Sequence, residues 1–511
     1  MVWSSALHRG RRPMLDRLPE VERSGRVDMN ARAGWLLRIS RYGLSETSGA
    51  AFAAEVGRTL RSGARRLSDS QLTAAEHGDR PVGSDLVRGY ELVLGMPEGA
   101  LAGPLEMASR HWVGWPWQFE QDRPAPRAEV DGLVRHFFDA VPSDALTGGD
   151  WLHLARVLTP PTAALGVPPQ LQSAWIAQLV DELMRSVDHA YFLRIEALSR
   201  LVAFPDTCAL AEEAIMRAVS EPGAQGVVDP LSALGDSQED EVFVRLIDLL
   251  SRATGAVRFG AALALVEPLH QDRLSPPLVQ RLAVALTTLG QAEPAPGDDL
   301  RMLVRLLPEA SRTELPPGLQ VDGVQTVEVG ADGEVARETT RYVEVVKRAT
   351  LPHTKDAMLE RLLSTAITNT SAADTFHALS LVAASPYRGI VSAAAGELIL
   401  QGRGTRALAA GRCRLIARLA TSGEEDILKQ LLEHPDPMVR NAALTGYAHT
   451  PRGIPHEVDL ETLMRHPTTA DRALYAAGMS QHRALDRLEL LSDDHTIITK
   501  WWRRHGGAVR T

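Results

Sequence analysis

From about Leu133 to the end of the chain, apolar residues recur at intervals of three and four. This spacing places apolar side chains on one face of a helix. Pro, Gly or Asp interrupts the pattern after roughly 10 to 18 residues, which is a usual helix length. The pattern therefore predicts an all-α chain in which short helices follow one another and pack side by side.

The clearest repeated unit is Glu433–Tyr447, in which an Asp-Pro turn is followed by Val-Arg and by small residues at spacings of three and four. The alanines let such a helix lie close to its neighbour. The unit resembles the second helix of a HEAT or armadillo repeat, and the resemblance implies an α-solenoid of helix pairs over residues 133–290 and 351–511. An irregular helical bundle is the alternative. Similar segments are Ala190–Val202, Thr254–Leu269, Pro386–Leu400 and Thr468–Met479.

Residues 291–350 interrupt this array, beginning with a Pro-rich stretch at Glu293–Gly297. Within them, Val324–Val329 and Glu334–Val346 alternate polar and apolar residues on either side of Asp332-Gly333. An Asp-Gly turn between alternating runs is typical of a hairpin. We expect a linker followed by a β-hairpin insertion. A lone hairpin is marginally stable, so it would lie against the helices or pair with another chain.

Leu67–Leu101 predicts two short helices joined by a sharp turn. Ser68 can accept hydrogen bonds from the free amides of the first turn. Gly78 can end that helix in the left-handed conformation, and Pro81 follows where it breaks no helical hydrogen bond. Ser84 or Asp85 then caps the second helix, which ends at a Gly-Met-Pro break.

This segment resembles the XRE (lambda-repressor-like) helix-turn-helix family. Trp35–Ser45 and Phe52–Gly57 resemble the family's first and second helices, so the resemblance covers a domain over residues 31–105. It implies sequence-specific binding of double-stranded DNA. One departure is the insertion Arg58–Arg66 before the recognition helix. An ordinary helical hairpin is the alternative. The matching features are Leu67-Ser68, Leu72, Thr73, Glu76, Gly78, Arg80-Pro81 and Leu94–Glu98.

The resemblance places the candidate DNA-binding residues in and around the recognition helix. Gln71 is expected to bond a base edge, while Asp69 either accepts from cytosine N4 or caps the helix. The family also binds palindromic sites as a homodimer. The recognition-helix candidates are Ser68, Asp69, Ser70, Gln71 and Thr73, and the candidates for phosphate contacts are Arg38, Arg65, Arg66 and Arg80.

The net charge of −9 is unevenly distributed. Residues 1–90 hold 15 arginines against 10 acidic residues, a balance of +5, which leaves −14 for the rest. This distribution is typical of a DNA-binding protein in which a basic domain contacts the DNA phosphates and an acidic body is repelled by them. An evenly charged, solvated surface is the alternative. Two widely separated cysteines, Cys208 and Cys413, indicate a reducing cytoplasm, and no apolar run is long enough to span a membrane.

Three further segments carry arginines or aromatic residues. Residues 1–30 are expected to form a disordered tail, with a DNA-contacting arm as the alternative. Residues 106–132 contain Trp112, Trp115 and Trp117 and are expected to form an aromatic connector, although such rings also stack on bases. The C-terminal Lys500–Gly507 is expected to pack its tryptophans on the last helix and to leave its charges in water.

The sequence holds no motif for catalysis. It lacks a phosphate-binding Gly-x-x-x-x-Gly-Lys loop, a Gly-x-Ser-x-Gly elbow and a His-Glu-x-x-His zinc motif. We therefore expect no enzyme, cofactor or metal. The sequence favours a transcriptional regulator in the nucleoid, with a helical-repeat body for dimerisation or for sensing a partner. The alternative is an interaction scaffold whose solenoid binds a partner protein and whose helix-turn-helix is degenerate.

Overall fold

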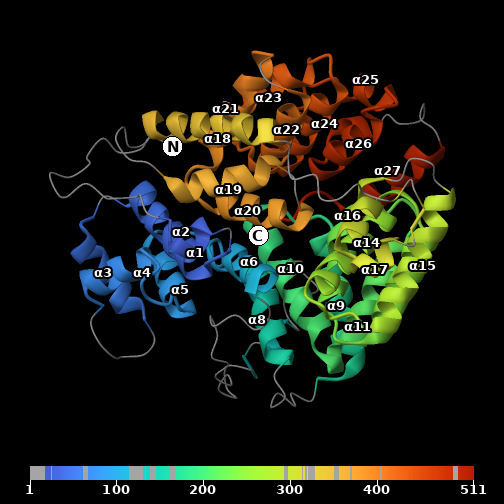
Figure 1. The fold of residues 1–511 in the computed structure, drawn as a ribbon, viewed down its shortest axis with the longest axis horizontal. Coiled ribbons are helices and arrows are strands. Elements are labelled where there is room, and N and C mark those ends of the chain that lie inside the picture. Colours follow the sequence, from blue (N-terminus) through green and yellow to red (C-terminus); the bar gives the residue numbers. More distant parts are fainter. Residues whose placement is uncertain are drawn as a thin grey trace. The chain divides into compact units, whose positions relative to one another are not determined.

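The computed structural model shows a chain built from helices (Figure 1). All regular elements in the described part are helical, apart from one parallel bridge between Ser186 and Val509. None of the described helices is both long and apolar enough to cross a membrane. The residues that the structure describes are 18–24, 26–45, 47–60, 67–113, 131–132, 134–137, 146–159, 167–292, 297–313, 315–316, 319, 329–349, 356–368, 371–402, 405–486 and 493–510.

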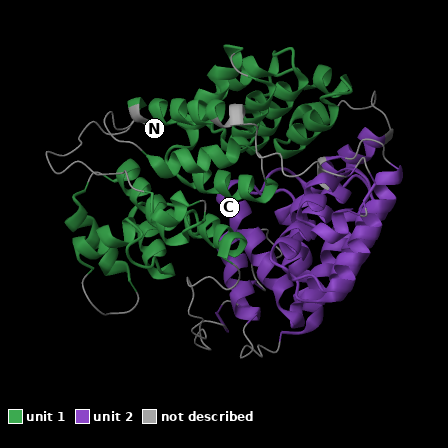
Figure 2. Cartoon of the chain, in the orientation of Figure 1, with its two compact units in different colours: residues 1–121, 327–487 green, residues 122–326, 488–511 purple. Residues whose placement is uncertain are grey.

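The chain divides into two compact units, each made from two separate segments (Figure 2). Unit 1 comprises residues 1–121 and 327–487, and unit 2 comprises residues 122–326 and 488–511. The predicted boundaries differ from this division, because the helix-turn-helix segment belongs to the same unit as the C-terminal helices. The sequence pattern located helices but gave no information on which distant helices share a core.

The N-terminal helices of unit 1 form a small bundle, which we call the head. The core of the head contains Phe52, Leu72 and Tyr90, all 0% exposed, with the rings of Phe52 and Tyr90 edge to face at 4.9 Å. The predicted disordered tail, residues 1–30, is wrong for its described end, which holds α1 and the first residues of α2. A buried ion pair between Glu22 of α1 and Arg32 of α2 fixes this segment. The head helices are α1 (Glu20–Arg23), α2 (Met29–Leu44), α3 (Gly49–Thr59), α4 (Asp69–Glu76), α5 (Ser84–Val93) and α6 (Ala102–Val113).

Helix α6 contains the first residues of the predicted aromatic connector. Its N-terminus is fixed by Glu91 of α5, whose buried carboxylate accepts from the backbone N–H groups of Gly99, Leu101 and Ala102. Arg110–Val113 are helical because the helix-breaking Gly114 and Pro116 come only after them. Residues 114–130 lie outside the described part.

The rest of unit 1 is an array of paired helices. Helices α6, α20, α22, α24 and α26 contact one another in that order, and α18, α21 and α23 form a second row. From α20 to α26 each helix thus packs on the next helix but one, as in an α-solenoid. The elements are α18 (Val329–Ala349), α19 (Ala357–Thr368), α20 (Ala372–Ala384), α21 (Arg388–Leu400), α22 (Arg406–Leu419), η3 (Ser422–Glu424), α23 (Glu425–Leu432), α24 (Pro437–His449), α25 (Leu460–Arg465), α26 (Ala470–Met479) and η4 (Arg483–Asp486).

The predicted β-hairpin is wrong over the part that the structure describes. Glu334–Val346 lies within the helix α18, and residues 324–328 lie outside the described part. The alternating segment also carries helical spacing, because Glu338, Tyr342 and Val346 recur every four residues and are buried. Glu338 forms a buried ion pair with Arg412 of α22, with Oε1 2.7 Å from Nε. Packing on α19 and α21 therefore favours the helix over the strand.

Unit 2 is a second array of the same kind. Helices α8, α10, α12, α14 and α16 form one row, while α9 contacts α11 and α13 contacts α15. These rows confirm helix pairs over the predicted repeat region. The elements are α8 (Gly148–Leu158), α9 (Pro169–Leu183), α10 (Asp188–Ala203), α11 (Pro205–Val219), α12 (Val228–Ala233), η2 (Leu234–Asp236), α13 (Asp240–Arg252), α14 (Gly255–His270), α15 (Pro276–Ala292), α16 (Asp298–Leu306), α17 (Glu309–Thr313) and α27 (Asp493–His505).

Small residues allow the close packing that the repeat pattern predicted. A Cβ added at Gly235 would lie 2.4 Å from the carbonyl oxygen of Ala264, so only glycine fits there. In α24 the predicted alanines Ala442 and Ala443 are buried. The C-terminal tryptophans are buried as expected, at 1% and 2% exposed for Trp501 and Trp502, but they lie within the last helix, α27, rather than in a tail packed on it. Arg503 is exposed, as expected.

Candidate nucleic-acid interface

The N-terminus of α4 is held by a reciprocal pair of hydrogen bonds. The Ser68 hydroxyl accepts from the Gln71 backbone N–H at 3.2 Å, and the Gln71 side-chain oxygen accepts from the Ser68 backbone N–H at 3.1 Å. This capping box satisfies two amides that the helix leaves open. The side-chain oxygen of Gln71 thus accepts a hydrogen bond within the helix cap. The sequence had instead predicted that Gln71 bonds a base edge.

Four of the expected recognition residues are exposed around the start of α4: Ser68, Asp69, Ser70 and Thr73. Ser70 also hydrogen-bonds Ser68, with 2.9 Å between the hydroxyl oxygens. Leu72, Ala75 and Glu76 of the same helix are buried. The helix therefore turns a polar face outward while its apolar face holds it in the head.

Asp69 lies against the first residue of α3. A Cβ added at Gly49 would be 2.3 Å from a carboxylate oxygen of Asp69, so glycine leaves the space that this side chain occupies. A carboxylate is favourable next to a helix N-terminus because the free amides carry partial positive charge. The predicted capping role of Asp69 is wrong, because Ser68 caps α4 and the Asp69 carboxylate lies beside the first residue of α3.

The C-terminal end of α4 is fixed by a buried ion pair. Glu76 accepts two hydrogen bonds from the Arg41 guanidinium, both at 2.6 Å, and one from the Tyr90 hydroxyl at 2.7 Å. Burial lowers the pKa of Arg41, but the bond and charge of Glu76 outweigh burial and raise it above its usual value. Burial and the Glu76 charge also raise the pKa of Tyr90. Arg41 thus stays charged, and Tyr90 is a neutral donor.

The expectation that Arg38 contacts phosphate is wrong. Arg38 is 9% exposed, and its Nη1 donates to the Glu76 carbonyl oxygen at 3.4 Å. Arg38 and Arg41 are three residues apart, so they share the face of α2 that packs on α4. Arg80 follows the turn after α4 and is exposed. Arg65 and Arg66 lie outside the described residues.

The pairing of Arg41 with Glu76 was not anticipated from the sequence. The available signal was the presence of Arg38 and Arg41 in a helix whose other residues from Met29 to Ser40 are largely apolar or small. A charged residue in a helix that is otherwise buried on all sides requires a partner. The sequence offers many carboxylates, however, and only the fold selects Glu76.

Gly78 ends α4 with a positive φ of 76°, as predicted. A Cβ there would lie 2.8 Å from the Ala31 Cα, so Gly78→Ala combines left-handed strain with a backbone clash. We expect the free energy of unfolding of the head to fall by about 2 kcal/mol or more, measured by native-state hydrogen exchange of α2 and α4. The matched control is Gly95→Ala, where φ is 63° but no described heavy atom lies within 4 Å. An equal loss in both variants would contradict the close approach of Gly78 to α2.

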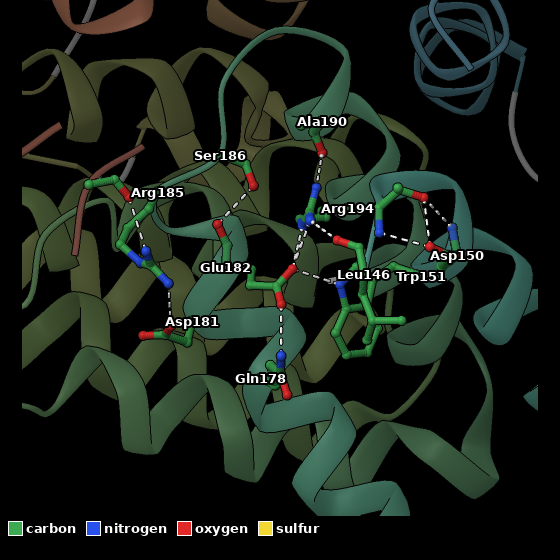
Figure 3. Close-up of polar contacts among 12 residues, drawn as sticks. Leu146, Asp150, Trp151, Gln178, Asp181, Glu182, Arg185, Ser186, Ala190 and Arg194 are labelled. Atoms are coloured by element: carbon green, nitrogen blue, oxygen red, sulfur yellow. Dashed lines mark hydrogen bonds and ion pairs between the residues drawn. The ribbon is translucent and has the colours of Figure 1, made fainter. Parts of the chain in front are cut away.

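A second polar cluster lies inside unit 2 (Figure 3). The Glu182 carboxylate accepts from Trp151 at 2.7 Å, from Arg194 Nε at 2.8 Å and from Gln178 at 2.9 Å. Arg194 also donates to the Leu146 carbonyl oxygen at 3.1 Å. Burial lowers the pKa of Arg194, and the Glu182 charge opposes this. These contacts tie α8, α9 and α10 together in the interior.

Comparisons with known proteins leave the family open. No family model matches the chain, and no curated protein matches it. One similar solved structure is an engineered protein with 15% identity and a TM-score of 0.21, covering 74% of this chain and 98% of that chain. Another concerns tubulin recruitment and assembly by microtubule polymerases with TOG domain arrays, with 12% identity and a TM-score of 0.20, covering 81% and 99%. Scores this low support no argument about fold or function.

Proposed function

We propose that this chain is a sequence-specific DNA-binding regulator whose head reads the major groove and whose helical arrays carry the head. The observation that supports this most is the exposed polar face of α4. Ser70 and Thr73 present hydroxyls on a helix that is capped at one end and fixed by the Arg41–Glu76 pair at the other. Hydroxyl side chains at such positions bond base edges or phosphates.

In this proposal the residues divide into base and phosphate contacts. Ser70 and Thr73 reach the DNA directly, Ser68 and Gln71 hold the start of α4, and Arg80 binds a phosphate. Asp69 limits the affinity for phosphates, because its negative charge lies beside the same surface. Two heads on a two-fold homodimer would read a palindrome, with half-sites about one helical turn apart.

The test uses the full chain, because the array covers Trp35 of the head. Fragments enriched from random DNA give a binding site, and affinities are then measured over a range of salt concentrations. We expect Ser70→Ala with Thr73→Ala to reduce discrimination at one or two base positions by about 1 kcal/mol, or about fivefold. Thr288→Ala, an exposed threonine on α15, is the control. Enrichment of no sequence would contradict the proposal.

Arg80→Ala is expected to weaken binding to all sequences alike. Loss of one phosphate contact should reduce the slope of log affinity against log salt by about 1. The matched control is Arg252→Ala, which removes an exposed arginine from unit 2 and should leave the slope unchanged. An unchanged slope for Arg80→Ala would exclude Arg80 as a phosphate contact without excluding DNA binding by α4.

The second candidate function is an interaction scaffold. The observation that favours it is the stacking of helices into rows in both units, an architecture that offers extended surfaces to partner proteins. Unit 2 also exposes the apolar Val284 and Phe259, at 62% and 38%. Salt-dependent DNA binding by the full chain distinguishes the two functions, because a scaffold with a degenerate head would show none.

A further inference from the structure

A cluster of polar rings joins the last helix of the head to the array. Asp374 of α20 accepts from His111 Nε2 at 3.0 Å and from the Trp112 indole N–H at 2.6 Å. His377, one turn further along α20, stacks on His111 with ring centroids 4.5 Å apart and planes 18° apart. We call these four residues, His111, Trp112, Asp374 and His377, the α6–α20 cluster.

The two histidines of this cluster have different surroundings. Both are buried, at 7% exposed for His111 and 9% for His377. His111 has the Asp374 carboxylate beside its Nε2. The buried Nδ1 of His377 has no hydrogen-bond partner among the described residues. His111 therefore has a carboxylate partner within hydrogen-bonding distance, whereas the Nδ1 of His377 has none among the described residues.

The charges that face His377 disfavour its protonation. Arg110 and His111 approach it from α6, and Asp374 on α20 is the acidic group nearby. Arg32 of α2 lies over the Trp112 ring at 4.0 Å, and Arg418 of α22 lies over the neighbouring Phe376 at 5.3 Å. Burial first, and then the charges of His111 and Arg110, hold the pKa of His377 well below its usual value. For Asp374, burial raises the pKa, but the bonds from His111 and Trp112 outweigh burial and lower it.

We propose that the α6–α20 cluster is a pH-sensitive lock between the head and the array of unit 1. With His377 neutral, the stacked rings hold α6 against α20. A proton on His377 places a charge without a hydrogen-bonded carboxylate inside the contact and separates α6 from α20. This device does not depend on whether the head binds DNA.

The direction of the pH dependence follows from proton binding. We call the state with α6 packed on α20 closed, and the state with these two helices separated open. In the open state His377 is in water, where histidine has a pKa of about 6.5. The open state therefore binds more protons than the closed state. The contact between α6 and α20 is therefore most stable above about pH 6.5 and becomes less stable as the pH falls. Below that value the open-to-closed ratio should rise about tenfold for each pH unit.

A second head–array contact responds in the opposite direction. Asp356, just before α19, accepts from the Trp35 indole N–H at 3.0 Å and from the Leu359 backbone N–H at 2.9 Å. Burial raises the pKa of Asp356. Asp356 therefore binds a proton more tightly when this contact is formed than when its side chain is exposed to water. Protonation of Asp356 thus favours this contact, whereas protonation of His377 weakens the α6–α20 cluster. The opening is expected to be local to α6 and α20.

Hydrogen exchange of the full chain between pH 5 and 8, corrected for intrinsic rates and without DNA, tests the lock. We expect protection of wild-type α6 and α20 to fall about tenfold per pH unit below about 6.5, while α24 keeps its protection. His377→Gln should make the protection of α6 independent of pH. His270→Gln, at an exposed histidine of unit 2, should behave as the wild type.

Two results would overturn the proposal. One is constant protection of α6 from pH 8 to 5 in the wild type, and the other is the same acid response in His377→Gln. If His377→Gln does not fold cooperatively at pH 8, His377→Phe replaces it, since phenylalanine keeps a ring against His111 and does not titrate. Retention of the acid response in His377→Phe would equally exclude His377 as the sensor.

Discussion

Glu76→Ala is expected to lower the free energy of unfolding of the head by about 3–5 kcal/mol. The substitution removes the acceptor for three hydrogen bonds from Arg41 and Tyr90. Arg41 then remains as a buried charge without its carboxylate partner, and this accounts for most of the loss. Native-state hydrogen exchange of peptides from α2 and α4 measures the effect, because a chain with two units does not unfold in a single step.

Two control variants distinguish the effect of breaking the Arg41–Glu76 pair from the effect of removing any one charge. Glu213→Ala breaks the exposed pair with Arg217 and should cost at most about 0.5 kcal/mol. Arg41→Met combined with Glu76→Met removes both charges, so it should recover much of the loss. A cost below about 1 kcal/mol for Glu76→Ala would show that water reaches Arg41 and that the pair does not fix α4.

Glu182→Ala is expected to destabilise unit 2 by a similar amount, about 3–5 kcal/mol. Glu182 accepts from Trp151, Gln178 and Arg194, and the Arg194 side chain is fully buried (Figure 3). Without Glu182 the guanidinium loses this carboxylate, while the backbone carbonyl groups of Leu146 and Ala190 still accept from it. Urea unfolding followed by hydrogen exchange of α8 and α10 measures the loss.

The control for this prediction lies in the same unit. Asp248→Ala removes the partner of Arg281 from a pair in which both side chains are well exposed, so it should cost at most about 0.5 kcal/mol. Glu182→Leu with Arg194→Leu should be less destabilising than Glu182→Ala alone, because no charge remains buried. Equal losses for Glu182→Ala and Asp248→Ala would contradict the burial of this network.

Prediction from the sequence succeeded where contacts are local. The cap at Ser68, the end of α4 at Gly78 and the helix after the Asp436-Pro437 turn all depend on hydrogen bonds between residues within four positions of one another. Such contacts are visible in the sequence because helix period and cap chemistry fix both partners. DNA binding by Ser70 and Thr73 remains a prediction.

Prediction failed where one segment carried both a strand and a helix period, and where a charged side chain pairs with a residue far away in the sequence. Glu334–Val346 carries both an alternating and a helical period, and packing decides between them. The family resemblance made Arg38 a candidate for a phosphate contact, but α2 is buried on nearly every side and Arg38 faces α4. The choice between solvent and interior depends on which helices surround α2.

The sequence by itself determined that this protein is a series of capped, amphipathic helices with a helix-turn-helix pattern near its N-terminus. Only the tertiary structure decided that the head and residues 327–487 form one unit, and that Trp35 and Trp112 donate to Asp356 and Asp374. The physical reason is that helix formation depends on neighbouring residues, whereas a buried polar group is satisfied by whichever distant partner the fold brings within hydrogen-bonding distance.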